Sequence, residues 1–448
     1  MNYPFIFGAK GGGGGTPSIP LSINGASAET LTEAFNLVAT LDGTPGGTYN
    51  AATDTLAFTS NSGWARPSDW RTLPTLTAAS EAGYILLFVY ENRLNQFTLQ
   101  IPNGTVDWGD GTTSAASAAV RTKTYTYSSI AQTVFVDPIT GENYKQVIIG
   151  ITRLGAAITY VDFTALSATV PNYAPQFAVD YNLSFPNCTE FRLGGVFQRE
   201  PRFIQILRIW SLGAITICRI FNAVNLKILQ IPTTFSGNFN GAFAARIGMV
   251  AFPDFNAGTA IGIGGILSGS YIVSHGNLIA NSAPSLGYYQ NTSPNIERFG
   301  SVTANLCTSI TYAWESCTAL TSIGLLTLPI CTDYSAAFAY CYSLVAIRVA
   351  NAAACTNTTS MLVQCYSLQV LHMPNLTRGV NFTNTSIGNY GMNIFASGNG
   401  VLNGVDTASG AQTITITGTP FGALVTAADA TALAIRAVLI GKGYTIAN

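Results

Sequence analysis

Hydrophobic positions recur every 24 residues between residues 293 and 376. Three apolar columns carry the pattern: Ile296, Leu320, Leu344 and Leu368; Phe299, Ile323, Ile347 and Leu371; and Trp314, Phe338 and Leu362. A looser set with steps of 22 and 21 residues runs through Ile204, Leu226 and Ile247. Self-similarity at a period of about 20–50 residues is typical of stacked repeats.

Each period predicts a short strand with inward apolar residues, then a turn and a return segment with a second apolar or aromatic residue. One such unit cannot bury its apolar face alone, whereas stacked units share a continuous core. We therefore expect a solenoid over residues 156–395.

Six of the eight cysteines follow the same 24-residue step, as Cys307, Cys331 and Cys355 and as Cys317, Cys341 and Cys365. Columns of this kind favour small, buried and inert side chains stacked between repeats. The alternative interpretation is a ladder of disulfides or reactive thiols. The chain has no C-x2-C pair and only two distant histidines, which does not fit a zinc site.

The spacing C-x-S-L-x-x-I-x7-C in Cys341–Cys355 resembles the bacterial surface-antigen (BspA-like) class of leucine-rich repeats. The resemblance covers roughly residues 155–395 and implies strands on a concave face. Two features depart from that class: the repeats hold few charged residues, and Ala257–Gly287 interrupts the register.

Residues 97–155 predict several short strands separated by turns. The string Val106-Asp-Trp-Gly-Asp-Gly111, followed by strands rich in tyrosine, resembles the polycystic-kidney-disease-type (PKD-like) β-sandwich. The resemblance implies a tight W-G-D-G turn, with Trp108 between two sheets and aspartates that cap backbone amides. Asp107 and Asp110 could instead be calcium ligands, but two carboxylates fall short of the six or more oxygens that calcium takes.

The two ends of the chain complete the expected organisation. Residues 1–18, with the run Gly11–Gly15, predict a docking arm with a flexible linker, and residues 19–96 predict a small β domain. Residues 396–448 predict an α/β cap made of a strand at 412–417, a helix capped by Thr426, and a strand at 444–446. The expected fold class is therefore mainly β, with small N-terminal β domains including a PKD-like sandwich, a leucine-rich-repeat solenoid and an α/β cap.

Charge narrows the choice of partners. The chain carries 20 Lys and Arg against 21 Asp and Glu, only 9% of its residues, where an ordinary domain has about 25%. A net charge of −1 gives no basic patch for nucleic acid. The apolar stretches are too short and interrupted for a transmembrane helix, and no secretory signal is visible at the start of the chain.

The residues for catalysis are sparse. Only His275 and His372 could act as imidazole bases, and neither lies in a triad motif. The carboxylates of the repeats share no column, and no phosphate-binding loop occurs. We therefore expect no enzyme activity, cofactor or metal, with a polysaccharide depolymerase as the enzymatic alternative.

A binding surface is the alternative to catalysis. The position after the second leucine of each repeat is expected to face outward, and its column contains Arg208, Gln230, Arg348 and His372 with small residues, Gly300 and Gly324 among them, between. This column is either a groove for a glycan or protein receptor or a solvated face. Tyr342 and Tyr366 are further candidates for receptor contact, or else packing residues between turns.

The order of motifs suggests a biological setting. Arg66-Pro-Ser-Asp-Trp70, followed by a strand pair and V-D-W-G-D-G, resembles tail-associated and other virion proteins of bacterial viruses. The resemblance implies a tail fibre, spike or appendage on the particle exterior that attaches to the host. Its partners would be other virion proteins, through the arm, and further copies of itself, as a trimer in a fibre. The alternatives are a capsid decoration protein and a cellular surface adhesin.

Overall fold

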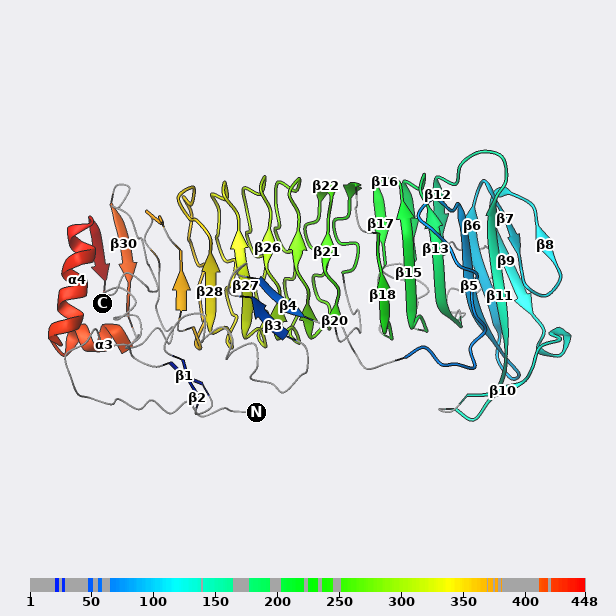
Figure 1. Ribbon diagram of the computed structural model, residues 1–448, viewed down its shortest axis with the longest axis horizontal. Coiled ribbons are helices and arrows are strands. Elements are labelled where there is room, and N and C mark those ends of the chain that lie inside the picture. Colours follow the sequence, from blue (N-terminus) through cyan, green and yellow to red (C-terminus); the bar gives the residue numbers. More distant parts are fainter. Residues whose placement is uncertain are drawn as a thin grey trace. The chain divides into compact units, whose positions relative to one another are not determined.

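The computed structural model describes residues 21–23, 26–28, 47–50, 55–58, 65–137, 140–163, 177–193, 203–220, 225–232, 236–244, 251–368, 370–373, 375–377, 380, 411–417 and 420–447. The described part is mainly β and contains a β-solenoid, so the expected class is confirmed at this level (Figure 1). The chain groups into two compact units, one of residues 62–272 and one of residues 273–448 with residues 1–61. The expected arm, residues 1–18, lies outside the described residues.

The unit of residues 62–272 begins with two antiparallel sheets. β5 (Ala82–Tyr90) lies beside β11 (Asn143–Arg153), which also pairs with β7 (Gly104–Asp107) and β10 (Phe135–Val136), and β7 pairs with β8 (Thr113–Ser114). The second sheet pairs β6 (Asn95–Ile101) with β9 (Ser117–Tyr125), and a 3-10 turn, Tyr127–Ser129, follows. The apolar run of β5 explains its central place, because six consecutive residues, 85–90, are buried.

Both sheets continue directly into stacked coils. β13 (Ala178–Phe185) pairs antiparallel with β5, and β15 (Ile206–Leu212) and β18 (Ile228–Gln230) follow in parallel. On the second sheet, β12 (Tyr160–Asp162) pairs with β6, and β14 (Glu190–Arg192) and β17 (Ile217–Arg219) follow in parallel. The boundaries expected at residues 96/97 and 155/156 therefore fall within continuous sheets.

Further short strands complete this unit. β16 (Ala214–Ile215), β19 (Ser236–Asn238) and β22 (Thr259–Gly262) form a third parallel ladder. β20 (Ala251–Phe252) and β21 (Phe255–Asn256) lie in the last described coil. The looser repeat thus corresponds to coils at Ile204 and Leu226, and its third member, Ile247, lies outside the described residues.

The unit of residues 273–448 contains the regular coils. One parallel ladder runs through β23 (Ser274–His275), β25 (Arg298–Phe299), β27 (Ser322–Thr327), β28 (Ala346–Val349) and β29 (Val370–His372). A second ladder joins β24 (Leu278–Ile279), β26 (Val302–Thr303) and the end of β27. The pairing partners lie 24 residues apart, with a one-residue shift between β27 and β28, so the period read from the sequence is the coil length.

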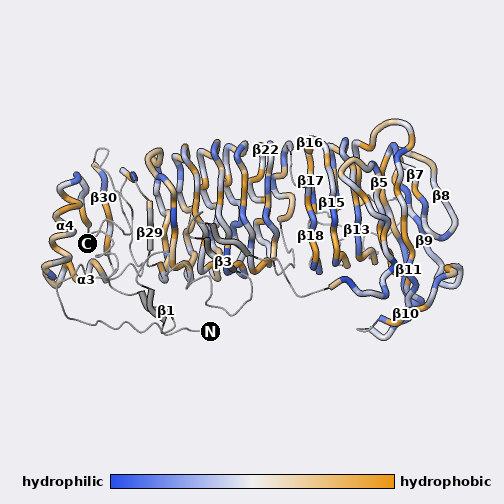
Figure 2. Tube along the Cα trace, viewed as in Figure 1, coloured by the Kyte–Doolittle hydropathy of each residue, from blue (hydrophilic) through white to orange (hydrophobic). Residues whose placement is uncertain are grey.

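The apolar columns form the core of these coils, and apolar and polar segments alternate along each coil (Figure 2). Ile296, Leu320, Leu344 and Leu368 have no exposed surface, and Trp314 stacks on Phe338 with 5.3 Å between ring centroids. All eight cysteines are free and buried, as the interpretation of small core side chains requires. The thiols of Cys317, Cys341 and Cys365 each lie within 3.1 Å of a carbonyl oxygen in the preceding coil.

A third contact line on each coil comes from side chains that cap the backbone. Isolated bridges connect Ser285, Ser309, Asp333 and Asn357 from coil to coil. Each side chain accepts a hydrogen bond from the N–H two residues later, for example Ser335 N to Asp333 Oδ1 at 2.9 Å. We call this row the capping ladder. It gives each coil the same local turn at the same place.

The C-terminal cap differs in part from the expected strand–helix–strand unit. β30 (Gln412–Thr415) pairs in parallel with β31 (Tyr444–Ala447), and two helices lie between them in the chain, α3 (Pro420–Thr426) and α4 (Ala430–Gly441). The prediction that Thr426 caps the long helix is wrong. Thr426 is the last residue of α3, and Asp429 caps α4 by accepting a hydrogen bond from Ala432 N.

Two short hairpins precede residue 62. β1 (Leu21–Ile23) pairs with β2 (Ala26–Ala28), and β3 (Gly47–Asn50) pairs with β4 (Thr55–Phe58). They agree with the prediction that this region is rich in β structure.

Candidate binding surfaces

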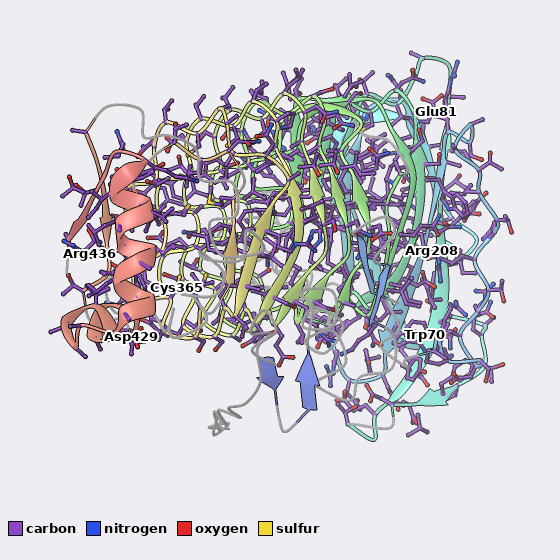
Figure 3. All side chains as sticks on the ribbon, turned by 60° about the vertical axis from the view of Figure 1, so that its left-hand side comes forward. Trp70, Glu81, Arg208, Cys365, Asp429 and Arg436 are labelled. Atoms are coloured by element: carbon purple, nitrogen blue, oxygen red, sulfur yellow. The ribbon has the colours of Figure 1, made fainter. Side chains whose placement is uncertain are left out.

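A segment without regular structure, residues 65–81, lies against the sheet formed by β5, β11, β13 and β15, and we call it the strap. Asp180 on β13 is fully buried and binds two arginines: Arg66 Nε of the strap donates to Oδ2 and Arg208 Nη1 of β15 donates to Oδ1, both at 2.8 Å. Arg208, predicted as a receptor contact, therefore holds a buried carboxylate. Figure 3 marks Arg208 and the strap residue Trp70.

Polar side chains on the same sheet hold the rest of the strap. Gln146 accepts a hydrogen bond from Arg71 N at 2.7 Å and donates to Asp69 O at 3.0 Å. Asn182 donates to Pro74 O at 2.7 Å and accepts from Trp210 Nε1. These two side-chain amides take the place of strand pairing, because they form hydrogen bonds with backbone N–H and C=O groups of the strap.

The W-G-D-G turn joins β7 to β8 and behaves as the sequence predicts. Asp107 Oδ1 accepts from Gly109 N at 2.8 Å, and Asp110 Oδ1 accepts from Thr112 N at 3.1 Å. Trp108 is buried, and Tyr125 Oη donates to its carbonyl. Asp capping is therefore confirmed at both positions. Among the described residues, no group of three or more His, Cys, Asp or Glu side chains could hold a metal ion.

Lys123 adds a charge to this turn. Its ammonium lies 2.6 Å from Asp110 Oδ2 and donates to Thr112 Oγ1 at 2.8 Å. Partial burial alone would raise the pKa of Asp110, but the hydrogen bonds from Lys123 and Thr112 outweigh it and hold that pKa below its ordinary value. The turn is thus stabilised by an ion pair as well as by hydrogen bonds from its backbone N–H groups.

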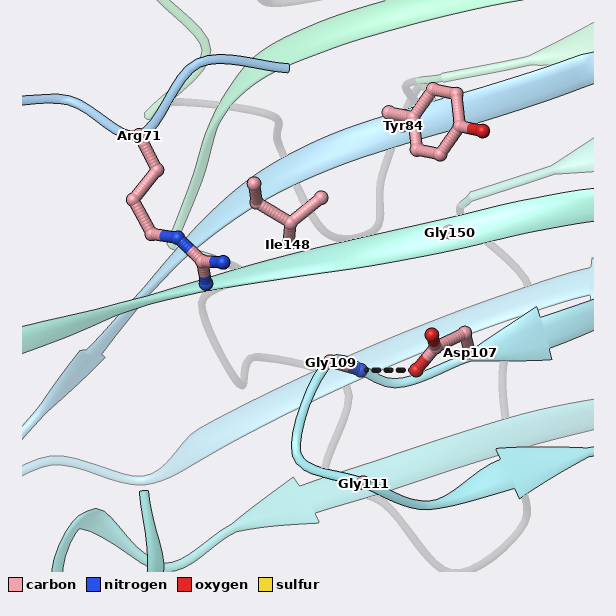
Figure 4. Close-up of a pocket in the computed structure, with 7 residues that line it drawn as sticks. All are labelled: Arg71, Tyr84, Asp107, Gly109, Gly111, Ile148 and Gly150. Carbon is pink, nitrogen blue, oxygen red and sulfur yellow. Dashed lines mark hydrogen bonds between the residues drawn. The ribbon is translucent and has the colours of Figure 1, made fainter. Parts of the chain in front are cut away.

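An open pocket of about 370 Å³ lies beside this turn (Figure 4). Arg71, Tyr84 and Asp107 are its polar lining residues, and Ile148 and the glycines of the turn and of β11 complete the lining. A guanidinium, a phenol and a carboxylate around a shallow hollow can bind a small polar group by several hydrogen bonds.

Exposed tyrosines form stacked pairs on the regular coils. Tyr342 and Tyr366 are 39% and 45% exposed, and their ring centroids lie 5.5 Å apart at 23°. Tyr288, 52% exposed, stacks on Tyr312 at 5.0 Å and 22°. Tyr334, by contrast, is buried and packs in the core. The 24-residue step creates the pairs, because it repeats a ring at the spacing of adjacent coils.

The predicted contact column does not form one continuous outward row. A Cβ at Gly300 would lie 2.5 Å from Gly276 O, and one at Gly324 would lie 2.6 Å from Ser301 N. The backbone of the preceding coil therefore fills the space that a side chain would need at these two positions. Arg348 pairs with Leu325 rather than with Gly324, because β27 carries an extra residue. Arg348 is half-buried on β28, and His372 follows it in register on β29, although its side chain lies outside the description.

The remaining candidates divide between the two units. Gln230 is half-buried on β18 and pairs in register with Arg208, in the unit of residues 62–272. Arg348, His372, Tyr342 and Tyr366 belong to the other unit. The structure brings Tyr342 and Tyr366 together, and it also pairs Arg208 with Gln230 and Arg348 with His372.

His275, one of the two possible imidazole bases, is a core residue. It is buried and stacks on Phe299 at 4.2 Å, and its Nε2 lies 3.1 Å from Tyr289 Oη. Burial lowers the pKa of His275 to about 4, so the ring is neutral near pH 7.

The comparisons with known proteins identify no relative. No family model matches the chain, and no curated protein or solved structure matches it either. Neither described helix is long and apolar enough to cross a membrane.

Proposed function

We propose that this chain is a non-catalytic structural protein on the exterior of a bacteriophage particle, a tail fibre, spike or other appendage that attaches to the host surface. The order of the R-P-S-D-W and V-D-W-G-D-G motifs supports the setting, and the low charge supports an assembly protein. Within this proposal, residues 1–18 dock to other virion proteins. No cofactor, metal, nucleic acid or membrane insertion is part of it.

We propose two finer fold assignments with it. The capped W-G-D-G turn and buried Trp108 support a PKD-like sandwich at residues 97–155. The 24-residue coils with leucine and isoleucine columns support a BspA-like leucine-rich solenoid at residues 156–395. The BspA-like class has strands on its concave face only, and the second strand ladder, β24–β26–β27, departs from that class.

The observation that carries the attachment role is the stacked pair of exposed tyrosines. A phenol ring offers a flat apolar face and a hydroxyl, so it can cover the C–H face of a sugar and bind a sugar hydroxyl. Tyr342 and Tyr366 lie on adjacent coils, and because their rings stack on each other, their exposed parts form one aromatic patch. A neutral surface polysaccharide of the host fits this patch best, because the C–H face of a sugar ring can pack on it while the sugar hydroxyls form hydrogen bonds around it.

The binding test compares the chain with the double variant Tyr342→Ala/Tyr366→Ala on purified host surface polysaccharide. Two lost aromatic contacts of about 0.5–1.5 kcal/mol each predict a roughly 5- to 150-fold weaker Kd. Tyr271→Ala is the matched control, because Tyr271 is 44% exposed and lies in the other unit. Equal binding by the chain and the double variant would contradict the tyrosine site.

The location test is immunogold labelling of purified particles. Label on the tail or on an appendage supports the proposal. Label spread over the capsid shell indicates a decoration protein instead, and label only on the bacterial surface indicates a cellular adhesin. New reducing ends in host polysaccharide after incubation with the purified protein would point to a depolymerase.

A further inference from the structure

Strand β11 contains a glycine that its backbone does not require. Gly150 pairs with Tyr84 of β5 on one side and with Asp107 of β7 on the other, so the three residues form one row across the sheet. Gly150 has no positive φ, and a Cβ there would lie 3.6 Å from the Tyr84 ring and 3.7 Å from Asp107 Cβ, which is ordinary contact. A glycine inside a strand weakens the strand, and it often marks a place where a ligand approaches closely.

This glycine lines the open pocket of about 370 Å³ beside the W-G-D-G turn, which we call the Gly150 pocket (Figure 4). The atoms that a Cβ at Gly150 would meet belong to Tyr84 and Asp107, and both residues line the same pocket. A longer side chain at position 150 would therefore extend into the pocket. Small ligands occupy pockets of about 300 Å³ or more, so the glycine keeps open a space of a useful size.

The polar residues of the Gly150 pocket have hydrogen-bonding groups to spare. Among the described residues, the Arg71 side chain has one partner, Gln146 O, at 3.4 Å from Nη1. Asp107 Oδ1 accepts from Gly109 N, and no described residue donates to its Oδ2 or pairs with its charge. The Tyr84 hydroxyl also has no hydrogen-bond partner within the described part of the chain.

These polar groups lie at two ends of the Gly150 pocket. The Arg71 guanidinium contacts the carbonyl of Gln146, which precedes Gly150 by four residues on β11, or about 13 Å along a strand. Figure 4 shows the guanidinium on the opposite side of the pocket from Tyr84 and Asp107. A ligand that reaches both ends needs an anionic group at one end and hydroxyl groups at the other.

A hexuronic acid has this arrangement of groups. Its carboxylate is attached to C5, and its hydroxyls on C2 and C3 lie across the sugar ring. The carboxylate suits the two-pronged guanidinium of Arg71, neighbouring hydroxyls can donate to Asp107, and the phenol of Tyr84 can donate or accept. A simple anion would gain nothing from Asp107. An α-amino acid carries its ammonium and carboxylate on one carbon, too close together to reach both ends.

We infer that the Gly150 pocket binds a uronic acid unit of an acidic polysaccharide. Arg71 binds the carboxylate, Asp107 and Tyr84 bind hydroxyls, and Gly150 leaves room for the ring. Because the pocket is open, the neighbouring sugars of the polysaccharide remain outside it. The inference goes beyond the proposed function, because this site lies in the unit of residues 62–272 and is independent of the tyrosine patch in the other unit.

The first test is calorimetric titration of the full chain with methyl glucuronide, with methyl glucoside and glucuronamide as neutral analogues. We expect saturable binding of the glucuronide, and roughly 10-fold weaker binding of either analogue, because hydrogen bonds between charged groups are lost. Arg71→Gln should weaken binding of the glucuronide by the same factor. Arg219→Gln is the matched control, because Arg219 is exposed on β17 of the same unit and does not line the pocket.

Two further variants test the hydroxyl end of the pocket. Asp107→Asn keeps an oxygen for Gly109 N but removes the charge, and Tyr84→Phe removes only the hydroxyl. Each should weaken binding of the glucuronide by about 2- to 10-fold.

The second test fills the Gly150 pocket. Gly150→Val should abolish binding of the glucuronide, because its methyl groups occupy the space of the sugar ring. Its melting temperature should equal or exceed that of wild type, because valine is favoured in strands and its Cβ meets only ordinary contacts. Thr152→Val is the control, because Thr152 lies on the same strand but does not line the pocket.

Four results would overturn the inference. The first is no saturable binding of methyl glucuronide, or equal binding of its neutral analogues. The second is undiminished binding by Gly150→Val, since the sugar would then bind elsewhere. The third is a lower melting temperature of Gly150→Val, which would show that the glycine serves the fold. The fourth is tighter binding of free alanine than of the glucuronide, which would indicate an amino acid site.

A last comparison separates this site from the tyrosine patch. Tyr342→Ala/Tyr366→Ala should bind methyl glucuronide as wild type does, so failure of the tyrosine patch would leave the Gly150 pocket standing. Loss of glucuronide binding by this double variant would contradict the pocket as the site.

Discussion

At the scale of single residues, the coils place ordinary side chains where glycine is usual. Two columns of residues have positive φ, and the members of each column lie 24 residues apart. The first column is Tyr288, Tyr312, Ala336 and Ser360, and the second is Thr292, Ser316, Tyr340 and Gln364. Non-glycine residues adopt this region at some cost. Backbone hydrogen bonds to the next coil, such as Tyr312 N to Ser335 O at 3.2 Å, hold the conformation. The repeated stack therefore enforces a backbone that each residue alone would avoid.

Gly109 is a position where glycine is required. Its φ is +71°, and a Cβ there would lie 2.2 Å from Ile148 O on β11. Gly109→Ala should lower the free energy of unfolding by about 3 kcal/mol or more, from backbone strain and the clash together. Urea unfolding of the full chain, followed by tryptophan fluorescence, measures the loss.

Gly111→Ala is the matched control for that experiment. Gly111 also has a positive φ, +87°, but no atom lies within 4 Å of the place that a methyl group would take there. Its substitution should cost only the backbone strain, about 1 kcal/mol. Equal losses for both variants would show that contact with β11 is unimportant.

At the scale of elements, the capping ladder shows how one short motif stabilises every coil. Asp333 is its one charged member, and it accepts hydrogen bonds from Ser335 N, Thr311 Oγ1 and Asn357 Nδ2 at 2.9, 3.0 and 2.9 Å. Partial burial alone would raise the pKa of Asp333, but these hydrogen bonds outweigh it and lower that pKa. The carboxylate therefore stabilises the fold most when it is ionised.

Asp333→Asn tests this assignment, because the next coil carries Asn357 at the same position. A lowered folded pKa gives stability that is present above the unfolded pKa and lost as the pH falls through the folded one. We expect wild type to unfold at a higher temperature than Asp333→Asn at pH 7, and the difference to start to shrink below about pH 4, the ordinary pKa of aspartate, and to be lost below the lower folded pKa. Asp69→Asn, at an exposed aspartate, is the control. A difference that persists at pH 2 would contradict the role of the charge.

The sequence predicted the periodic elements well and the local exceptions poorly. Columns of Leu, Ile and Cys identify coils because burial constrains each member equally, and the W-G-D-G turn is visible because its glycines and aspartates are locally required. The shift between β27 and β28 left no sign, since the 24-residue step resumes at Asn357. Thr426 and Asp429 are both acceptable helix caps, and only the presence of α3 decides between them.

The binding candidates show the same limit. Arg208 fits an exposed position by alternation, but it pairs with the buried Asp180 of the neighbouring strand β13. The second arginine on that carboxylate, Arg66, comes from a strap more than 100 residues earlier in the chain. Tyr342 and Tyr366 share one period, so their stacking follows from the repeat alone. Contacts between equivalent positions of neighbouring repeats are therefore predictable, and contacts across unrelated segments are not.

At the scale of the whole molecule, the regular coils are interchangeable units. Each contacts its neighbours through the same ladders, columns and capping positions, so stability is close to a sum of coil and neighbour terms. Removing one complete period should therefore bring matching surfaces together again.

Deletion of residues 322–345, one 24-residue period, should give a soluble protein with an unchanged circular dichroism spectrum and a modestly lower melting temperature. It joins Thr321 to Ala346 and sets Cys317 and Cys365 one coil apart. Deletion of residues 322–333, half a period, is the control, because it stacks one ladder on another and should cause aggregation. Equal solubility of the two deletions would contradict the coil register.

The passage of both antiparallel sheets into parallel coils has a consequence for the newly made protein. β5 and β6 are synthesised before β12 and β13, which pair with them, and each later coil pairs with the one before it. Within residues 62–272, the strands β12 to β15, β17 and β18 thus find a strand to pair with already in place when they leave the ribosome. We expect this unit to assemble in the order of translation, as a zipper closes from one end, and to refold more slowly from the complete denatured chain.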